Sequence, residues 1–465
     1  MLFSSITFLY YFLPCVLILY FIAPSKLKNT VLLLASLVFY AWGEPVYVLL
    51  MAVSIAVGYF CGLGVERFRG KTVSKVFLGV SVAISLGFLG YFKYADFFIS
   101  NFNAATGLSV PLLNIALPIG ISFYTFQLIS YTIDVYRGEK AQKNPINLAA
   151  YITMFPQLIA GPIVRYSDIA HGLTERKHTL DGFASGATRF ALGLAKKILI
   201  ANALGELCDT FRTSDDKSVM FYWLYAVAYA LHVYFDFSGY SDMAIGLGRI
   251  FGFEFMENFN YPFISSSATE FWRRWHISLG SWFRDYVYIP LGGNRVSAPR
   301  HLFNIFTVWL LTGFWHGAAW TFIAWGLFFA VLLTAEKFFL LRYLKKSKVI
   351  SRVYILLAVL ISFVIFNAAD LREAGQYIGA MFGAGDFPAV SAEFFYYLRS
   401  YAVTLLLGVI GATPIVRNAV LKIKENKTGG KVIAAVQPVA VAALIAVATA
   451  YLVDGSFNPF LYFRF

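Results

Sequence analysis

The chain has 465 residues, of which 59% are hydrophobic and only 14% are charged. So few charged residues cannot cover a soluble globule of this size, which excludes a soluble enzyme or binding protein. The formal net charge is +13, but the lysines and arginines lie mainly in short loops between apolar runs, which is typical of cytoplasmic loops and argues against nucleic-acid binding. We expect an all-α, polytopic membrane protein surrounded by membrane lipids.

Several apolar stretches have roughly the length of a membrane-spanning helix, which needs about 17 to 25 residues. Examples are residues 6–23, 76–94, 354–369 and 432–453. The whole chain predicts roughly ten to twelve crossings. The hydrophilic connections are too short to form a soluble domain, so residues 1–465 are expected to form a single membrane-embedded domain. The first apolar run lacks the basic start and cleavage site of a signal peptide.

Basic loops predict the orientation of the chain. Residues 24–29 and 66–75 are rich in lysine and arginine and are expected in the cytoplasm, which places the N-terminus outside. Between them, the Trp-Gly-Glu-Pro sequence at residues 42–45 predicts the outward-facing turn of a helical hairpin. A further basic cluster precedes the last apolar run, so the C-terminal tail, residues 454–465, is expected outside the membrane as well.

An irregular element is expected near the middle of the chain. Residues 155–162 read Phe-Pro-Gln-Leu-Ile-Ala-Gly-Pro, with two prolines inside an apolar stretch. Proline removes a backbone donor, which predicts a broken or re-entrant element. Such backbone survives at membrane depth only where protein or water satisfies it.

The most informative residue is His316, in an apolar run that has no acidic or basic residue. Residues 302–335 form 34 positions without a formal charge, whereas about 20 suffice to cross the bilayer, so the chain must break or tilt. Gly313 and Gly317 mark the expected break, which would hold His316 inside the membrane beside Trp315 and Trp320. Desolvation favours the neutral imidazole, the form that a general base requires. The alternative is a small-residue packing face in which His316 hydrogen-bonds a neighbouring helix.

A second histidine, His276, lies in a sequence rich in tryptophan and arginine. At helical spacing Trp272 and His276 share one face with apolar residues, while Glu270 is placed to pair with the arginines that follow it. This pattern predicts a continuous amphipathic helix whose histidine points into the protein. An interfacial helix anchored at the lipid headgroups is the alternative.

A third polar cluster comprises His232, Asp236 and Asp242. His232 and Asp236 are one helical turn apart and are placed to orient each other. Buried carboxylates in a membrane segment are costly, so the cluster predicts either a structural polar network or a functional one. The six histidines show no close metal-ligand spacing, and we expect no metal site. The three cysteines lie singly, without the paired spacing of a disulfide or a metal site.

Two strings carry a family resemblance: residues 270–279, Glu-Phe-Trp-Arg-Arg-Trp-His-Ile-Ser-Leu, and residues 283–295, which include Tyr-Ile-Pro-Leu-Gly-Gly-Asn-Arg. Residues 155–162, 234–246 and 313–320 add to them. Together these sequences resemble the membrane-bound O-acyltransferase family, in its bacterial branch similar to the membrane subunit of alginate O-acetylation. The resemblance covers most of the chain.

The resemblance implies a ring of transmembrane helices around a thinned centre, where a cytoplasmic acyl donor and an extracytoplasmic acceptor meet through a tunnel. It makes His316 the family's catalytic histidine and His276 its second signature histidine. The protein would then O-acetylate an exported or cell-wall polysaccharide from the bacterial cytoplasmic membrane. No bound cofactor is implied. Acetyl-CoA or an acylated carrier protein is the donor, and the partner is an extracytoplasmic acetyl-transferring or esterase-like protein.

The last six residues, Phe-Leu-Tyr-Phe-Arg-Phe at 460–465, fit the pattern F-x-Y-x-x-F. This pattern resembles the C-terminal motif of the small partner protein of teichoic-acid D-alanylation, in which the tyrosine is the implied acyl relay. Tyr462 is therefore a candidate relay on the outer side of the membrane. An aromatic anchor at the membrane interface is the alternative.

Two other functions are compatible with a polytopic membrane protein. One is a D-alanyl transferase acting on a cell-wall polymer, although residues 290–295 resemble the acetyl-transferring branch more closely. The other is a lipid or sugar transporter without covalent chemistry. Transporters often contain repeats with broken helices at corresponding positions, and the segments around His276 and His316 show no such counterpart in the first half of the chain.

Overall fold

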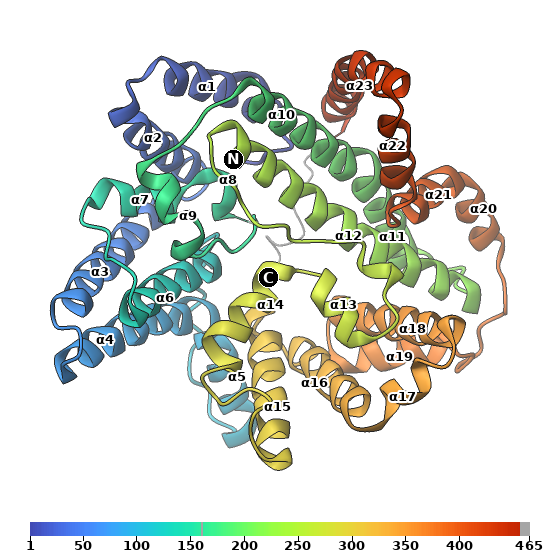
Figure 1. Cartoon of the computed structure of the whole chain (residues 1–465). Helices are drawn as coiled ribbons and strands as arrows, with labels where there is room; N and C mark the ends of the chain where they lie inside the picture. The colour runs from blue at the N-terminus through green and yellow to red at the C-terminus, as the bar shows by residue number, and fades with distance from the viewer. Residues whose placement is uncertain (160, 456–465) are drawn as a thin grey trace. The chain divides into compact units, whose positions relative to one another are not determined.

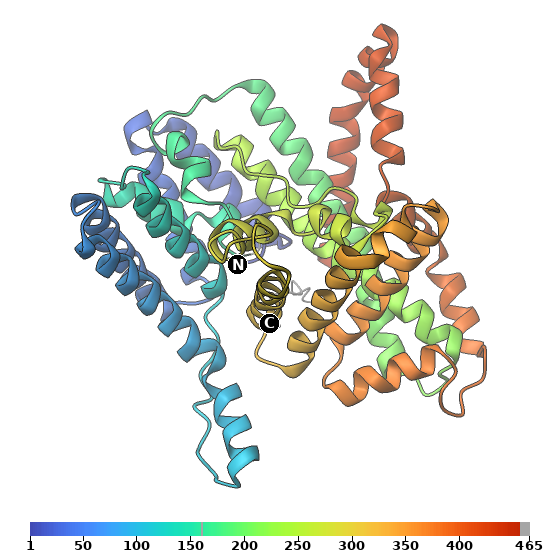
Figure 2. The ribbon, with the colours of Figure 1, turned by 60° about the horizontal axis from the view of Figure 1, so that its bottom comes forward.

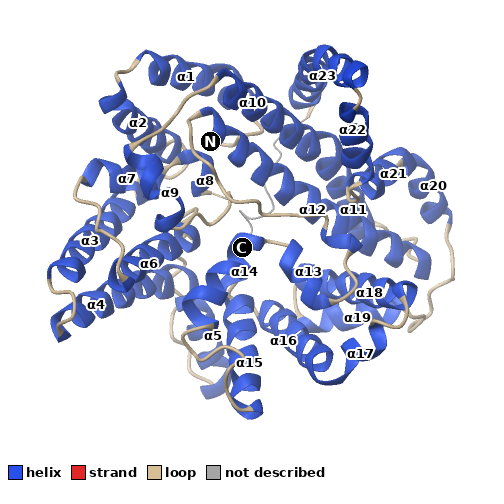
Figure 3. Cartoon of the chain, viewed as in Figure 1, coloured by secondary structure: helices blue, strands red, loops and turns tan. Residues whose placement is uncertain are grey.

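The computed structural model describes residues 1–159 and 161–455. In that part of the chain every regular element is helical, as Figures 1 and 3 show, which confirms the all-α class. The chain divides into two compact units: unit 1 contains residues 1–190 and 243–256, and unit 2 contains residues 191–242 and 257–465. A single domain over residues 1–465 stays a prediction.

Unit 1 is built from helices of the first part of the chain. They are α1 (Leu13–Ile22), α2 (Lys28–Ala41), α3 (Tyr47–Arg67), α4 (Thr72–Leu89), α5 (Ala95–Thr106), α6 (Ile121–Arg137), α7 (Pro145–Thr153), α8 (Phe155–Leu158) and α9 (Tyr166–Thr174), followed by most of α10 (Leu180–Ala195). Helices α3, α4 and α6 pack against one another, and α2 packs against α7. Gly62 of α3 permits the close approach to α6, since a Cβ there would lie 2.5 Å from the Tyr131 hydroxyl oxygen.

Unit 2 contains most of α12 (Val219–Ile250) and nearly all of the later helices. These are α11 (Asn202–Thr213), α13 (Ala268–Arg274), α14 (Ile277–Phe283), α15 (Ala298–His316), α16 (Trp320–Ala335), α17 (Leu341–Leu344), α18 (Lys348–Asn367), α19 (Leu371–Met381), α20 (Ala392–Ser400), α21 (Ala402–Gly411), α22 (Ile415–Glu425) and α23 (Lys427–Asp454). Helices α15 and α16 form a closely packed pair, and α22 lies beside α23, as Figure 2 shows.

Five helices in the described residues are long and apolar enough to cross a membrane: Tyr47–Arg67, Thr72–Thr106, Trp320–Leu344, Lys348–Asn367 and Lys427–Asp454. The pair α20 and α21, bent by 60°, adds a sixth if it is counted as one broken span. Of the four apolar stretches singled out in the sequence, residues 76–94 and 432–453 fall within these helices, and residues 354–369 overlap one of them. The expected ten to twelve crossings are not confirmed by this count.

The two expected interruptions in the first half of the chain are confirmed. The turn at residues 42–45 separates α2 from α3. The broken element follows α7, where α8 is a single helical turn and the backbone is buried. Side chains satisfy this irregular backbone: the Phe155 amide donates to the Ser36 hydroxyl at 3.0 Å, and the Tyr151 hydroxyl donates to the Val164 carbonyl at 2.9 Å. The break therefore lies where the protein itself supplies hydrogen-bond partners.

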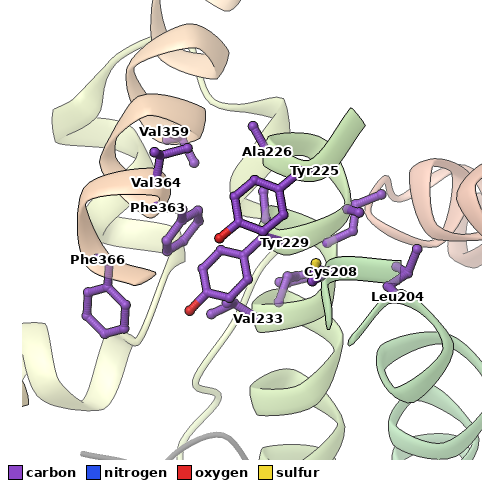
Figure 4. Close-up of a cluster of buried hydrophobic side chains, with 14 of the residues drawn as sticks. Leu204, Cys208, Tyr225, Ala226, Tyr229, Val233, Val359, Phe363, Val364 and Phe366 are labelled. Carbon is purple, nitrogen blue, oxygen red and sulfur yellow. The ribbon is translucent and has the colours of Figure 1, made fainter. Parts of the chain in front are cut away.

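The core of unit 2 is aromatic. Tyr225 and Tyr229 of α12 lie beside Phe363 of α18, and α11 contributes Leu204 and Cys208 (Figure 4). Phe366, one turn further along α18, belongs to the same cluster. The cluster therefore extends along α18 towards the C-terminal end of α15, because Phe366 also contacts His316.

Candidate functional site

His316 is the last residue of α15, directly before the expected break. Gly317 has an extended backbone (φ −172°, ψ 162°), and α16 begins three residues later at Trp320. The break at Gly317 is thereby confirmed, whereas Gly313 remains helical. A Cβ at Gly313 would overlap the Phe322 carbonyl oxygen, so Gly313 permits the close packing of α15 on α16. A Cβ at Gly317 would overlap Cε2 of the Phe322 ring, so both glycines permit close packing on α16, and Gly317 in addition ends the helix.

The His316 imidazole lies in an aromatic enclosure. Its side chain is 5% exposed. The Trp325 and Phe366 rings lie almost perpendicular to it, with centroids at 5.0 Å and 5.3 Å. Trp315 contacts it from the preceding position, at 5.0 Å. Trp320, which is also expected beside this histidine, is 55% exposed, and Trp325 of α16, which the sequence analysis did not single out, contacts the imidazole. The enclosing rings exclude bulk water, which favours a neutral imidazole.

The expected continuous amphipathic helix around His276 is wrong. Helix α13 ends at Arg274, the next residue is extended, and His276 has a left-handed backbone (φ 44°, ψ 53°) before α14 begins. Residues 258–260 cause the interruption by offering competing backbone partners. The Ile277 amide donates to the Asn258 carbonyl at 3.0 Å, and the Asn260 amide donates to the Arg274 carbonyl at 2.9 Å. The expected inward direction of His276 is confirmed, since it is only 1% exposed.

Hydrogen bonds of Asn258 determine which nitrogen of neutral His276 carries the proton. The Asn258 side-chain oxygen accepts from the Ser278 amide at 3.2 Å and from the Ser278 hydroxyl at 2.8 Å, while its nitrogen donates to the Ser241 hydroxyl at 3.0 Å. A backbone amide can only donate, so the atom facing it is the oxygen. His276 Nδ1 lies 3.2 Å from the same oxygen and must donate to it. The lone pair of neutral His276 therefore resides on Nε2.

His276 Nε2 is buried and has no hydrogen-bond partner in the described part of the chain. A buried acceptor without a donor is costly in a structural role, because the desolvation penalty of the nitrogen is not offset. The edge of the Phe237 ring packs against the imidazole at 4.6 Å between centroids and holds its plane. Nε2 is thus placed to accept a hydrogen bond from a bound molecule.

Trp315 connects the two histidines. Its ring centroid lies 6.0 Å from that of His276 and 5.0 Å from that of His316. The structure therefore brings two residues that are 40 positions apart in the sequence into contact with one indole. Two neutral imidazoles against a shared apolar wall can accept protons or hydrogen bonds from a hydroxyl group bound there.

The third polar cluster is arranged through lysines that the sequence analysis did not single out. Asp236 forms a buried ion pair with Lys197, and Asp242 accepts from Lys196 at 2.7 Å. His232 instead lies with Nδ1 2.6 Å from the Ala201 carbonyl. Both lysines begin the π-helical segment Lys196–Ala201, which directs adjacent residues to different carboxylates of α12. Two lysines within an apolar run were the signal in the sequence that could have identified them.

Two further expectations concern residues and ligands away from these helices. Tyr462 lies outside the described residues. Among those that are described, no three His, Cys, Asp or Glu side chains converge in a way that could hold a metal ion, and the expectation of no metal site stays a prediction.

Comparisons with known proteins show the family of the chain. A family profile described as MBOAT, membrane-bound O-acyltransferase family, matches residues 116–371, which include His276 and His316. The probable alginate O-acetylase AlgI of Azotobacter vinelandii is 41% identical, and the alignment covers 100% of each chain.

More distant relatives have other named activities. The peptidoglycan O-acetyltransferase of Helicobacter pylori is 35% identical over 72% of this chain and 70% of its own. The teichoic acid D-alanyltransferase of Bacillus subtilis is 32% identical over 48% of this chain and 59% of its own. An acyltransferase does covalent chemistry, which sets aside the transporter without covalent chemistry. The chain thus belongs to the membrane-bound O-acyltransferase family and is a multi-pass membrane acyltransferase.

Proposed function

We propose that this acyltransferase transfers acetyl from a cytoplasmic thioester donor for the O-acetylation of an exported or cell-wall polysaccharide. The observation that carries the proposal is the enclosure of His316 by Trp325 and Phe366, with His276 in contact with the same Trp315 ring. The full-length similarity to a probable alginate O-acetylase supports acetyl as the group and a polysaccharide as the final acceptor.

In the proposed reaction, His316 takes the proton from an acceptor hydroxyl, whose oxygen attacks the thioester carbonyl. A carbon–oxygen bond forms, the carbon–sulfur bond breaks, and the thiolate leaves and regains the proton. His276 Nε2 accepts a hydrogen bond from the same hydroxyl or from a neighbouring donor of the substrate. The donor is acetyl-CoA or an acylated carrier protein.

The proposed architecture is a ring of about ten to twelve transmembrane helices around a thinned centre, with a tunnel in which donor and acceptor meet from opposite sides. Broken helices at α8, α13–α14 and α15–α16 support it, because irregular backbone at membrane depth normally lines a cavity or lies within protein. Both termini are proposed to be extracytoplasmic in the bacterial cytoplasmic membrane, as the basic loops indicate.

A substitution that keeps the size of His316 tests its role. His316→Gln retains hydrogen-bonding capacity but cannot act as a base near neutral pH, so acetyl transfer should fall by about 10²- to 10⁴-fold. The matched control is His171→Gln, because His171 is a surface histidine whose side chain is 84% exposed. Both proteins should unfold at the wild-type temperature in detergent. A folded His316→Gln enzyme with the wild-type rate would refute the assignment.

Tyr462 is proposed as an acyl relay. Its phenolic oxygen would receive the acetyl group and pass it to an extracytoplasmic acetyl-transferring or esterase-like partner protein. Mass spectrometry of the C-terminal peptide after incubation with donor tests this step. Acetylated Tyr462 in the wild type, but in neither Tyr462→Phe nor His316→Gln, supports the relay. A Tyr462→Phe enzyme that still supports polymer acetylation at the full rate contradicts it and favours a membrane anchor.

A D-alanyl transferase is the second candidate, favoured by the similarity to a teichoic acid D-alanyltransferase over about half of the chain. The same peptide analysis separates the two, since the D-alanyl ester carries a primary amine and adds a different mass from acetyl. Competition between the two donors in one assay shows which acyl group the enzyme prefers.

A further inference from the structure

We propose that unit 1 contains a binding site for a phosphate group at three basic side chains, Lys28, Arg176 and His178, which we call the basic cluster. All of its residues belong to unit 1, and the proposal does not depend on the acyl-transfer reaction. Lys28 is the first residue of α2, while Arg176 and His178 lie in the connection between α9 and α10. Tyr20 of α1 lies at the centre of the cluster.

Arg176 is held in a fixed position. Its guanidinium carbon lies 4.4 Å from the centroid of the Phe253 ring, and its Nη2 donates to the Asn29 side-chain oxygen at 2.6 Å. The Asn29 amide is itself oriented, because its nitrogen donates to Asn147 at 2.7 Å and to the Leu173 carbonyl at 2.8 Å. Arg176 Nη1 is buried and has no hydrogen-bond partner among the described residues. The guanidinium is thus fixed by Phe253 and Asn29 and still has N–H groups to donate. Such a group suits a planar, bidentate contact with an anion.

The other two basic side chains meet Arg176 around one aromatic ring. The Tyr20 centroid lies 4.9 Å from Lys28 Nζ and 5.9 Å from the guanidinium carbon of Arg176. The Tyr20 hydroxyl donates to the Phe251 carbonyl at 2.8 Å, so it must accept from His178 Nε2 at 2.9 Å. The three basic side chains are therefore held by uncharged groups: the faces of aromatic rings, the Tyr20 hydroxyl and the Asn29 side-chain amide.

The cluster has no acidic counterpart. In the described part of the chain none of the three side chains forms an ion pair with a carboxylate, and the charges that act on them are one another and Tyr20. Lys28 adds to the imbalance, since a cation at the N-terminus of a helix is disfavoured by the helix dipole. The pKa of His178 is lowered by burial and by the repulsion of Lys28 and Arg176. A bound anion would relieve this repulsion.

The surroundings indicate the kind of anion. The three side chains are half-buried and converge, so the ligand must be compact and strongly charged; a phosphate offers several acceptor oxygens to them. Apolar side chains next to the cluster are exposed, including Ile22 at 78% and Leu27 at 52%. The phosphate can therefore belong to a lipid headgroup, with its acyl chains along α1, or to a soluble phosphate, and the experiment separates the two.

Thermal unfolding of the full-length protein in detergent tests the site with three additives: phosphatidylglycerol, a diacylglycerol with the same chains but no phosphate, and inorganic phosphate. We compare the wild type with Arg176→Gln and with the matched control Lys177→Gln, which removes the same charge from the exposed neighbouring residue. Phosphatidylglycerol should raise the unfolding temperature of the wild type and of Lys177→Gln, whereas diacylglycerol should not. In Arg176→Gln the concentration needed for half of the effect should rise at least about tenfold, which corresponds to the loss of a charge-assisted contact.

Each outcome decides the question. A response to inorganic phosphate as well identifies a site for free phosphate, and a response to phosphatidylglycerol alone identifies a lipid site. If Arg176→Gln responds like the wild type, if Lys177→Gln loses as much, or if no phosphate-bearing additive acts on the wild type, the proposal is wrong. Lys28→Gln, which breaks no hydrogen bond that fixes the fold, takes the place of Arg176→Gln if the latter does not fold.

Discussion

Replacing Asn258 by leucine should separate the stability of the enzyme from its activity. Leucine has nearly the same size but cannot accept the hydrogen bonds from His276 Nδ1 and from the Ser278 amide. The histidine can respond by moving its proton to Nε2, so that Nδ1 can accept from the Ser278 hydroxyl; the Ser278 amide and the new Nε2–H are then left without an acceptor. The cost in unfolding free energy should therefore be about 2–6 kcal/mol, at about 1–3 kcal/mol for each of the two buried donors without a partner.

The effect on catalysis should be larger, because the proton shift removes the lone pair from Nε2, the nitrogen that faces no protein donor. If a substrate hydroxyl donates to this atom, acetyl transfer should fall by about 10²-fold or more, as for other groups that assist proton transfer. Asn258→Asp keeps the acceptor oxygen and should retain more activity than Asn258→Leu.

The matched control is Asn304→Leu. Asn304 is also a fully buried asparagine in unit 2, and it donates to the carbonyls of Leu291 and Gly293, away from the imidazoles. The Asn304→Leu variant should lose stability to a similar extent, and its rate of acetyl transfer should stay within a few fold of the wild-type rate. Nitrogen NMR of labelled histidine reports the protonated nitrogen directly. An Asn258→Leu protein whose His276 still carries its proton on Nδ1, or which reacts at the full rate, would refute the reasoning.

The remaining predictions concern packing, charge and pH. Gly313→Ala should lower the unfolding free energy by about 1–3 kcal/mol because its Cβ overlaps backbone of α16, whereas Gly375→Ala, in open space on α19, should have no such cost; thermal unfolding in detergent compares the two. Lys197→Met should cost about 3–5 kcal/mol by leaving Asp236 buried without its cation, and the double variant Lys197→Met, Asp236→Leu should recover most of that loss in the same assay. Because the pKa of His178 is lowered in the folded protein, its contribution to stability is fully present above about pH 6.5 and declines as the pH falls below that value; a smaller decline in His178→Gln checks this.

Local patterns predicted the parts of the structure that depend on neighbouring residues. The length of the uncharged run and the position of Gly317 predicted the helix end at His316, and the prolines at residues 156 and 162 predicted the broken element. These signals act over one or two helical turns. The buried position of His316 therefore followed from the sequence.

Contacts between distant residues could not be predicted in the same way. The amphipathic pattern around His276 favours a continuous helix, but residues 258–260 compete for its backbone and interrupt it. The roles of Asn258 and Trp315, and the pairing of Asp236 with Lys197, also depend on residues far apart in the chain. The spacing of residues in a single sequence does not indicate which distant residues come into contact.

The left-handed backbone of His276 has a consequence for engineering this enzyme. A non-glycine residue in that conformation costs about 1–2 kcal/mol, and glycine avoids the cost. A His276→Gly protein should therefore regain part of the stability that is lost with the imidazole contacts, more than His276→Ala does. A selection for heat resistance alone would therefore favour glycine over other replacements of His276, although the imidazole would be lost. Screens for robust variants should consequently measure turnover alongside the melting temperature.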